Sequence, residues 1–284
     1  MDYANPDGIV STEWLERHLG GPDVRVIDAS YWQPIMQRDA KAEYEDCHIP
    51  GAVRFDIDDV ADPDSPLPHT LPDAELFARK VGQLGLGDGQ RIVVYDNVGG
   101  VSAAARVWWM FRTYGHRQVA VLQGGFSKWL REQRPVDDLV VTPVPHVFTP
   151  RFDSGLLRSL DQVSASLSGG REQIVDARKA VYFHAVVPDP AEARPGHIPG
   201  SLNLPALDLL DGRELTILPA DKLRQKFEAA GVDFEKPIIA TCGSGVTCCL
   251  LALGLYLLGK TDVANYDGSW NEWSAHQELP VARE

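Results

Sequence analysis

The chain repeats one plan twice, and this repetition limits the folds that are open to it. Four short motifs occur in the same order in each half, at separations between 144 and 149 residues. The paired landmarks are Asp28 with Asp176, His48 with His197, Asp96 with Cys242, and Trp129 with Trp273. Chance does not account for four landmarks in one order with so little drift, so we infer a duplicated domain.

Each half alternates short Val/Ile-rich runs with helix-like segments. The predicted strands are 24–28, 91–95, 119–122, 173–176, 237–241 and 262–266. The predicted helices are 12–19, 73–84, 102–114, 159–167, 220–230 and 247–258. Uninterrupted apolar strands between helices are typical of a parallel sheet that helices cover on both faces. We therefore predict an α/β chain with domains at 1–139 and 159–284, joined by a proline-rich linker at 140–158.

Charge and composition exclude several kinds of partner. The 284 residues carry a formal net charge of −13, which argues against nucleic acid and anionic membranes. The longest apolar run, 248–258, is too short to span a bilayer and predicts a buried helix. The N-terminal residues do not resemble a signal peptide, so we predict a cytoplasmic protein.

The chain has four cysteines: Cys47, Cys242, Cys248 and Cys249. They form no disulfide framework, and their spacing matches no common metal site. We therefore expect neither a metal nor a cofactor. Cys248 and Cys249 fall on the apolar helix, where core packing is the expected role.

Cys242 is the candidate nucleophile. It begins a loop, Cys242-Gly243-Ser244-Gly245-Val246-Thr247, between a predicted strand and a predicted helix. The glycines let the backbone curl so that successive N–H groups point at the cysteine sulfur, and the helix dipole adds positive potential there. Both effects favour a thiolate and an anionic adduct on it, so this loop is expected to bind the group that Cys242 carries. The first half has Asp96 at the matching position and so lacks the nucleophile.

The chain resembles the two-domain rhodanese-type sulfurtransferases, most closely the 3-mercaptopyruvate branch. The residues that carry the resemblance are His-Ile-Pro-Gly at 48–51 and 197–200, Phe-Asp-Ile-Asp at 55–58, and the runs 105–110, 242–247 and 266–270. The thiosulfate-preferring branch usually has positive residues after the cysteine, whereas Gly243 and Ser244 are neutral.

The resemblance implies tandem rhodanese-like domains and a ping-pong reaction through a Cys242 persulfide. The donor would be 3-mercaptopyruvate, with thiosulfate as a second possibility. The acceptor would be cyanide or a thiol, such as a thioredoxin-type protein or a small thiol.

The resemblance also implies roles for single residues. The family's proposed proton relay maps onto Ser244, His69 and Asp58; a loop histidine without a chemical role is the other interpretation of His69. The two family arginines that hold the substrate carboxylate are replaced here by Tyr182 and Ala191. Arg194 and His184 are the candidate substitutes.

Arg178 is retained, and its family position predicts a structural ion pair. Two alternative functions stay open. One is a persulfide carrier or sensor that passes sulfur to a protein partner, which the missing arginines favour. The other is a phosphatase, which would need an arginine six residues after the cysteine, where this chain has Cys248.

Overall fold

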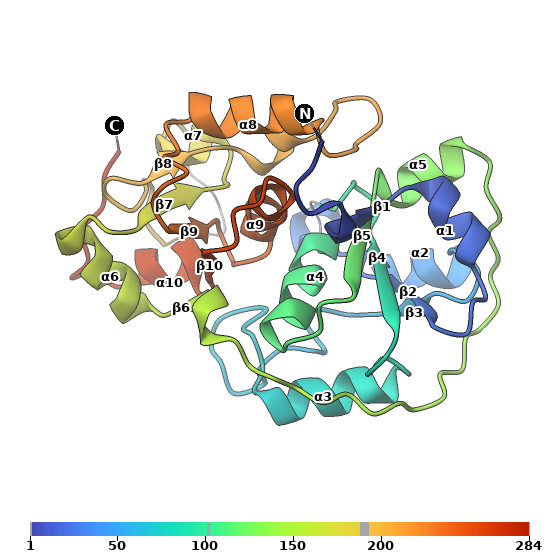
Figure 1. The fold of residues 1–284 in the computed structure, drawn as a ribbon. Helices are drawn as coiled ribbons and strands as arrows, with labels where there is room; N and C mark the ends of the chain where they lie inside the picture. The colour runs from blue at the N-terminus through green and yellow to red at the C-terminus, as the bar shows by residue number, and fades with distance from the viewer. Residues whose placement is uncertain (1, 101–102, 188–192, 284) are drawn as a thin grey trace.

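The two halves of the chain form two five-stranded parallel sheets with equivalent strand orders, β1-β5-β4-β2-β3 and β6-β10-β9-β7-β8 (Figure 1). The computed structural model describes residues 2–100, 103–187 and 193–283. Each strand of the first sheet has its counterpart at the same place in the second. The predicted α/β duplication, with helices on both faces of each sheet, is therefore confirmed.

The strands occur in two sets of five. They are β1 (Ile9–Val10), β2 (Val24–Asp28), β3 (Val53–Arg54), β4 (Arg91–Tyr95), β5 (Val119–Leu122), β6 (Leu157–Arg158), β7 (Gln173–Asp176), β8 (Leu202–Asn203), β9 (Ile238–Thr241) and β10 (Val263–Tyr266). All six predicted strands are present to within one residue. Within the described residues, the strands that the sequence did not reveal are the two-residue edge strands β1, β3, β6 and β8. β6 lies inside the segment 140–158 that we assign to the linker, and it pairs with β10.

The helices alternate with these strands. They are α1 (Thr12–His18), α2 (Ala40–Asp46), α3 (Ala74–Gln83), α4 (Ala104–Thr113), α5 (Gly125–Arg131), α6 (Leu160–Gly169), α7 (Ala180–Phe183), α8 (Ala220–Ala229), α9 (Cys248–Leu257) and α10 (Ser269–Ala275). The 3-10 helices are η1 (Pro6–Gly8), η2 (Pro34–Met36), η3 (Ser154–Leu156) and η4 (Ala206–Leu209). The six predicted helices agree to within two residues, and residue 102 of the range 102–114 lies outside the described residues. The others in the described chain, α2, α5, α7 and α10, have seven residues or fewer, too few for a clear apolar period.

Strand side chains alternate between the two faces of each sheet, and this alternation divides the core. In β4, Val93 and Tyr95 join an outer cluster under α1 and α5. Ile92 and Val94 face the other way and join a cluster that continues into the second domain. That shared cluster includes α3 and α4 of the first domain and α8 and α9 of the second. The two domains therefore have one continuous apolar core between them.

Helices α4 and α9 lie side by side where the domains meet (Figure 1). Nearly every residue of α9 is buried, because one side packs on its own sheet and the other on α4. A helix that is apolar all round requires such a position, so the predicted burial of this helix is confirmed. No helix in the described part of the chain is long and apolar enough to cross a membrane.

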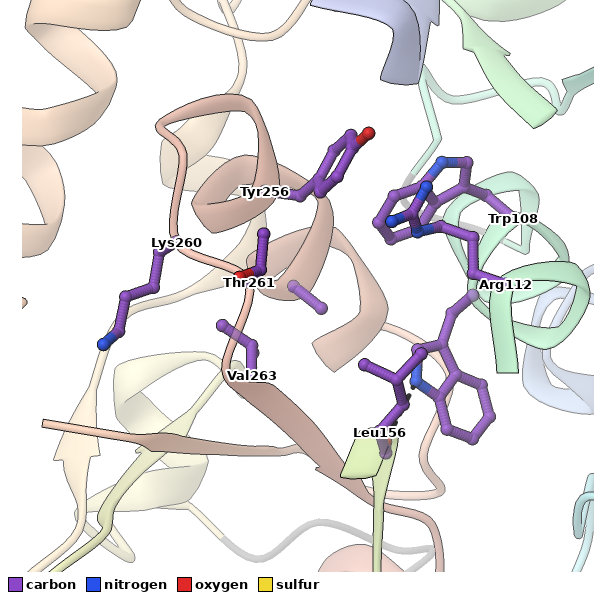
Figure 2. Close-up of a pocket in the computed structure, with 9 residues that line it drawn as sticks. Trp108, Arg112, Leu156, Tyr256, Lys260, Thr261 and Val263 are labelled. Atoms are coloured by element: carbon purple, nitrogen blue, oxygen red, sulfur yellow. Dashed lines mark hydrogen bonds between the residues drawn. The ribbon is translucent and has the colours of Figure 1, made fainter. Parts of the chain in front are cut away.

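A small cavity opens between α4 and α9 (Figure 2). Trp108 and Arg112 of α4 face Tyr256 of α9 across it. The Arg112 guanidinium lies 4.1 Å from the centre of the Tyr256 ring and 5.1 Å from that of Trp108. The residues that line this cavity do not include any from the loop 242–247, so it is an interface feature rather than the candidate active site.

A buried arginine joins the loops of the two domains. Arg106 of α4 is fully buried and pairs with Asp267, which follows β10. Its guanidinium also donates to the carbonyl oxygen of His69 at 2.6 Å and to that of Gly245 at 3.2 Å. The other oxygen of Asp267 accepts the N–H of Leu71 at 2.7 Å. Burial lowers the pKa of Arg106, but Asp267 more than offsets this and holds the pKa above its ordinary value, so the charge is retained.

We expect Asp267→Asn to lower the free energy of unfolding by about 3–5 kcal/mol, because it leaves the Arg106 charge buried without a counterion. Asp262→Asn is the matched control. Asp262 lies 2.8 Å from Lys260 and is 54% exposed, so its loss should cost less than about 1 kcal/mol. Urea unfolding of both variants measures the difference, and equal losses would contradict the assigned role of Arg106.

Candidate active site

Cys242 lies at the carboxyl end of β9, and the residues after it curl into a loop that leads to α9. Its side chain is buried, with 1% exposed. The start of α10 fixes the backbone around it: Ser269 Oγ accepts the N–H of Cys242 at 3.2 Å, and Trp270 N–H donates to the Cys242 carbonyl at 3.0 Å. Asn271 N–H donates to the carbonyl of Gly243 at 2.9 Å. The loop is therefore held from behind by α10, the last helix of its own domain.

The two glycines of the loop have different surroundings. Gly245 has a φ of +76°, and a Cβ there would collide with the carbonyl oxygen of Asp267. Close packing against Asp267 therefore excludes any larger residue. A Cβ on Gly243 would meet no described atom within 4 Å, so this residue faces open space. The loop is packed against the domain interface at Gly245 and open at Gly243.

Burial raises the pKa of the Cys242 thiol. Hydrogen bonding from the side chains of Cys248 and Thr247 and from the N–H groups of Cys248 and Ser244 more than offsets burial and lowers this pKa to about 5. A pKa near 5 favours the thiolate of Cys242 at neutral pH. Val246 is buried behind the loop.

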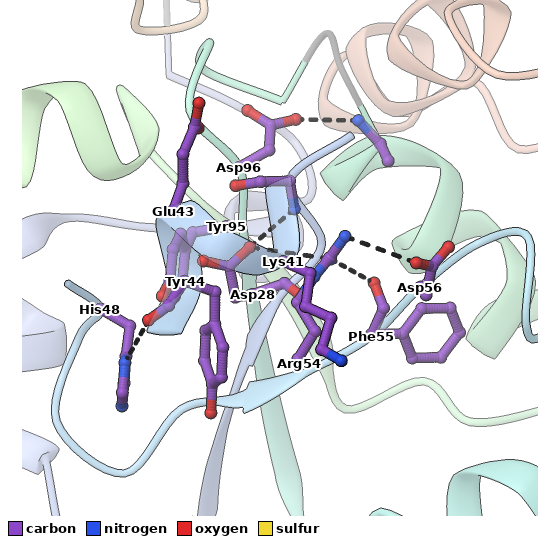
Figure 3. A network of polar contacts seen from close by, with 12 residues as sticks. Asp28, Lys41, Glu43, Tyr44, His48, Arg54, Phe55, Asp56, Tyr95 and Asp96 are labelled. Carbon is purple, nitrogen blue, oxygen red and sulfur yellow. Dashed lines mark hydrogen bonds and ion pairs between the residues drawn. The ribbon is translucent and has the colours of Figure 1, made fainter. Parts of the chain in front are cut away.

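The first domain has the same kind of loop, and the side chain of Asp96 lies in it. The carboxylate of Asp96 accepts the N–H of Val98 at 2.9 Å, that of Gly100 at 2.8 Å, and those of Ala103 and Ala104 at 3.0 Å each. Figure 3 shows Asp96 with one of these bonds, at the carboxyl end of the strand that also carries Tyr95. Asp96 is wholly buried. The same backbone thus stabilises a carboxylate in one domain and a thiolate in the other.

Two members of the predicted relay are in contact. The Nδ1 atom of His69 lies 2.6 Å from Asp58 Oδ1, and this hydrogen bond lowers the pKa of Asp58 despite partial burial. His69 is 7% exposed and has a φ of +61°, which is strained for a residue with a side chain. Its carbonyl is held by Arg106, which also holds Gly245. The turn that carries His69 is thus tied to the Cys242 loop, and the link from His69 to Ser244 stays a prediction.

The segment after β7 holds the predicted substrate contacts. β7 pairs with β9, so Asp176 lies beside Thr241 and the following residues start next to Cys242. Arg178 pairs with Asp176 at 2.8 Å and donates to the carbonyl of Gly196 at 2.8 Å, in agreement with the predicted structural ion pair. Tyr182 lies in α7 and His184 directly after it, where the His184 ring contacts Phe183.

Arg194 has a different environment from the one that a substrate contact needs. Its guanidinium donates to backbone carbonyls at 2.6 to 3.2 Å. The acceptors are Trp273, Ser274, His276 and Leu279. To bind a carboxylate it would have to give up these bonds. We assign the side chain to holding the C-terminal segment. Ala191 lies outside the described residues.

The model of the rhodanese-like domain family matches residues 11–132 and again 159–276. The chain belongs to the rhodanese family. It is 42% identical over 271 residues to 3-mercaptopyruvate sulfurtransferase of Homo sapiens, covering 93% of this chain and 91% of that protein. It is 44% identical over 274 residues to thiosulfate sulfurtransferase of Bos taurus, with the same coverage of 93% and 91%.

Solved structures agree with this family. The crystal structure of SseA from Escherichia coli, a 3-mercaptopyruvate sulfotransferase with the rhodanese fold, superposes with a TM-score of 0.85 at 38% identity. The superposition covers 93% of this rhodanese chain and 98% of SseA. This rhodanese is thus an enzyme of the sulfurtransferase type, as its sequence predicts.

Sequence reasoning left four site residues of this rhodanese without a role. Arg106 and Asp267 lie in two of the motifs that carry the family resemblance. Nothing in those motifs reveals that the two side chains meet across the domain interface. Ser269, with a φ of +52°, anchors the N–H of Cys242. Cys248, which we expected to serve only as core, also contributes to the lowered pKa of Cys242. This contribution has a weak sequence signal, since Cys248 is the residue where the loop meets the helix.

We expect alkylation of Cys242 by iodoacetamide to follow pH with a midpoint near 5, the value to which its pKa is lowered. Only the thiolate reacts, so the rate should be at its plateau at pH 7 and fall as the pH drops below about 5. Cys47 is the internal control, because burial raises the pKa of its thiol and its reaction should need alkaline pH. Peptide mass spectrometry separates the two sites. A midpoint above pH 8 for Cys242 would contradict the assigned hydrogen bonds.

Proposed function

We propose that this sulfurtransferase moves sulfane sulfur from a small-molecule donor, through a persulfide on Cys242, to a thiol or cyanide acceptor. The observation that supports it is the buried thiol of Cys242 at the end of β9, whose pKa is lowered to about 5 by hydrogen bonding from its own loop and the start of α9. Such a site stabilises negative charge on sulfur before, during and after transfer. The Asp96 carboxylate in the matching loop of the first domain supports the same argument, because this backbone binds an anion there.

The reaction has two half-reactions. In the first, the Cys242 thiolate attacks the sulfane sulfur of the donor. The bond from that sulfur to the rest of the donor breaks, and its electron pair leaves with the departing group. In the second, a thiolate or cyanide attacks the outer sulfur of the persulfide. The S–S bond breaks, and its electron pair returns to Cys242. No net oxidation or reduction of the enzyme remains after a full cycle.

We propose 3-mercaptopyruvate as the main donor, with thiosulfate as a second one. The neutral residues Gly243 and Ser244 support the first choice, because nothing cationic follows the nucleophile in the loop. When 3-mercaptopyruvate loses its sulfur, the departing enolate must gain a proton. Ser244 Oγ, supported by His69 and Asp58, is the group that we propose to supply it. Sulfite, which leaves thiosulfate, is a stable anion and needs no such proton.

We propose that Tyr182 and His184, rather than Arg194, meet the anionic group of the donor. Both follow the carboxyl end of β7, which lies beside the carboxyl end of β9 and Cys242. Arg194, by contrast, donates its hydrogen bonds to backbone carbonyls. A neutral phenol in place of an arginine should hold a carboxylate less firmly. We expect this difference to appear in KM for 3-mercaptopyruvate more than in kcat.

We propose a thiol as the usual acceptor, either a small thiol or a thioredoxin-type protein, in a reducing compartment such as the cytoplasm. The free cysteines of the chain agree with a reducing environment. A carrier or sensor that loads sulfur but releases it only to one protein partner is the competing function, favoured by the missing arginines at Tyr182 and Ala191.

A donor screen tests the proposed function. We expect 3-mercaptopyruvate or thiosulfate to add one sulfur atom to the Cys242 peptide, as measured by intact and peptide mass spectrometry, and a thiol to remove it with turnover. Cys242→Ser should abolish loading and turnover, while Cys47→Ser should leave both nearly unchanged. Full activity in Cys242→Ser would refute the mechanism. Loading without turnover to any thiol or to cyanide would favour the carrier.

The relay predicts a difference between donors. Ser244→Ala should slow persulfide formation from 3-mercaptopyruvate by roughly 10²–10⁴-fold, the usual worth of general acid catalysis, and leave formation from thiosulfate nearly unchanged. His69→Ala should show the same asymmetry. Single-turnover mixing experiments with each donor measure it. If both donors slow equally, Ser244 only shapes the loop; if His69→Ala is silent, the relay is wrong but the persulfide mechanism stands.

A further inference from the structure

The turn that carries His69 has a counterpart in the second domain. Both turns lie between an edge strand and the long helix that follows it, β3 and α3 in the first domain, β8 and α8 in the second. His69 has a φ of +61° and Leu215 a φ of +55°. The carbonyl of the next residue accepts a backbone N–H from earlier in the same loop, at 2.9 Å for Thr70 and 2.8 Å for Thr216. The duplication therefore includes one strained turn in each domain.

Each turn crosses to the other domain and contacts the residue that directly follows a strand there. The N–H of Leu71 donates to Asp267 Oδ2 at 2.7 Å, after β10. The N–H of Ile217 donates to Gln123 Oε1 at 2.8 Å, after β5. Both donors lie two residues beyond the strained position, so the interface makes the same junction twice. We call the first the cysteine-side junction and the second the aspartate-side junction, after the loops beside them.

The aspartate-side junction is neutral. Its acceptor is the side-chain amide of Gln123. Its turn packs directly on the loop of the first domain, since a Cβ on Gly99, three residues after Asp96, would lie 2.2 Å from the carbonyl oxygen of Leu215. A left-handed turn is thus held against such a loop without an ion pair.

The cysteine-side junction differs from it by a buried ion pair. Its acceptor is the Asp267 carboxylate, which also pairs with Arg106. The wholly buried guanidinium donates to the carbonyl oxygens of His69 at 2.6 Å and of Gly245 at 3.2 Å. The residue of α9 that corresponds to Arg106 of α4 is Ala252, which carries no charge. The chain therefore places a cation only at the junction beside the cysteine loop.

Stability does not account for this difference. A buried ion pair often adds no net stability over a neutral contact of similar shape, and the aspartate-side turn forms without one. Geometry does account for it. The planar guanidinium of Arg106 makes three hydrogen bonds, to the turn, to the cysteine loop and to the residue after β10. Such a group fixes angles as well as distances, which a single bond to an amide does not.

We propose that Arg106 is a positioning residue, whose guanidinium holds the His69 turn against the Cys242 loop and so keeps the imidazole in one place relative to the nucleophile. The hold rests on the hydrogen bonds above. Its effect on the reaction rests on the proposed function, in which His69 supports proton delivery. A displacement of about 1 Å at a reacting group is worth roughly a hundredfold in rate.

A double variant makes the cysteine-side junction neutral like its counterpart. Asp267→Gln supplies the amide that the other junction has, and Arg106→Met removes the cation while filling its space. Because both charges are removed together, neither stays buried alone, and the double variant should unfold at a higher urea concentration than Asp267→Asn. Arg106→Lys is the second variant, which keeps the charge but loses the planar fork. Gln123→Ala is the matched control, since it breaks the aspartate-side junction instead.

Amide hydrogen exchange, measured by NMR, tests the hold without any sulfur donor. In the double variant and in Arg106→Lys, the Leu71 N–H should exchange about tenfold faster or more, because its turn opens more easily once the hydrogen bonds of the guanidinium are lost. The Ile217 N–H should keep its wild-type rate in both. Gln123→Ala should show the reverse pattern. Unchanged exchange of Leu71 in both Arg106 variants would overturn the proposal.

Persulfide formation from 3-mercaptopyruvate tests the consequence for the reaction. The double variant should slow it by roughly 10–100-fold. His69→Ala should then have little further effect in that background, because a displaced imidazole has already lost its role. Formation from thiosulfate and the alkylation midpoint of Cys242 should stay near their wild-type values, since Ser269 still anchors the loop. Gln123→Ala should load sulfur from both donors at the wild-type rate.

The outcomes distinguish this inference from its alternatives. If the losses in the double variant and in His69→Ala multiply, Arg106 does not act through the histidine and the proposal is overturned. A raised alkylation midpoint in the double variant would overturn it too, because the cysteine loop rather than the turn would have moved. A failure of the proposed function appears separately, as absent loading or as a silent His69→Ala in the wild-type background. The role in the reaction then falls with it, while the exchange of Leu71 still decides whether Arg106 holds the turn.

Discussion

The buried charge of Arg106 is the constraint on which the site depends. One guanidinium holds the carbonyl of His69 in the first domain, the carbonyl of Gly245 in the Cys242 loop, and the carboxylate of Asp267 after β10. A charge in this position must keep its partners, because burial without them is costly. It therefore fixes the distance between the two domains at the point where their loops meet. The apolar contact of α4 with α9 provides the buried surface between the domains. The guanidinium of Arg106 fixes which loops of the two domains lie opposite each other.

Duplication explains why the site has this form. Both domains end their central strand in a loop of inward-facing N–H groups, and in both the loop surrounds an anion. In the first domain the Asp96 side chain occupies the loop, in the place where the second domain has a cysteine. In the second domain that cysteine is Cys242, whose thiol has a pKa lowered to about 5. One backbone thus has two uses, and a single side chain decides between them.

Much of the fold could be predicted from the sequence. The central strands and the long helices have clear apolar patterns, because buried strands and helices need apolar side chains at fixed periods. Edge strands such as β1 and β6 have two residues each and leave no such pattern. The family resemblance carried the contact of His69 with Asp58, which the structure contains at 2.6 Å. Arg194 was predicted as a substitute substrate contact, and its hydrogen bonds to backbone carbonyls could not be foreseen, because such acceptors have no signature in the sequence.

The sequence by itself determined the duplicated architecture, the position of the candidate nucleophile and the glycines that let its loop curl. These are local properties, since period, spacing and backbone freedom are set by neighbouring residues. Only the tertiary structure decided which distant groups surround the cysteine. Arg106 reaches the loop from the other domain, and Ser269 anchors it from α10. Such pairings depend on how helices and domains pack, because a side chain's neighbours in space are chosen by the whole fold and not by its place in the chain.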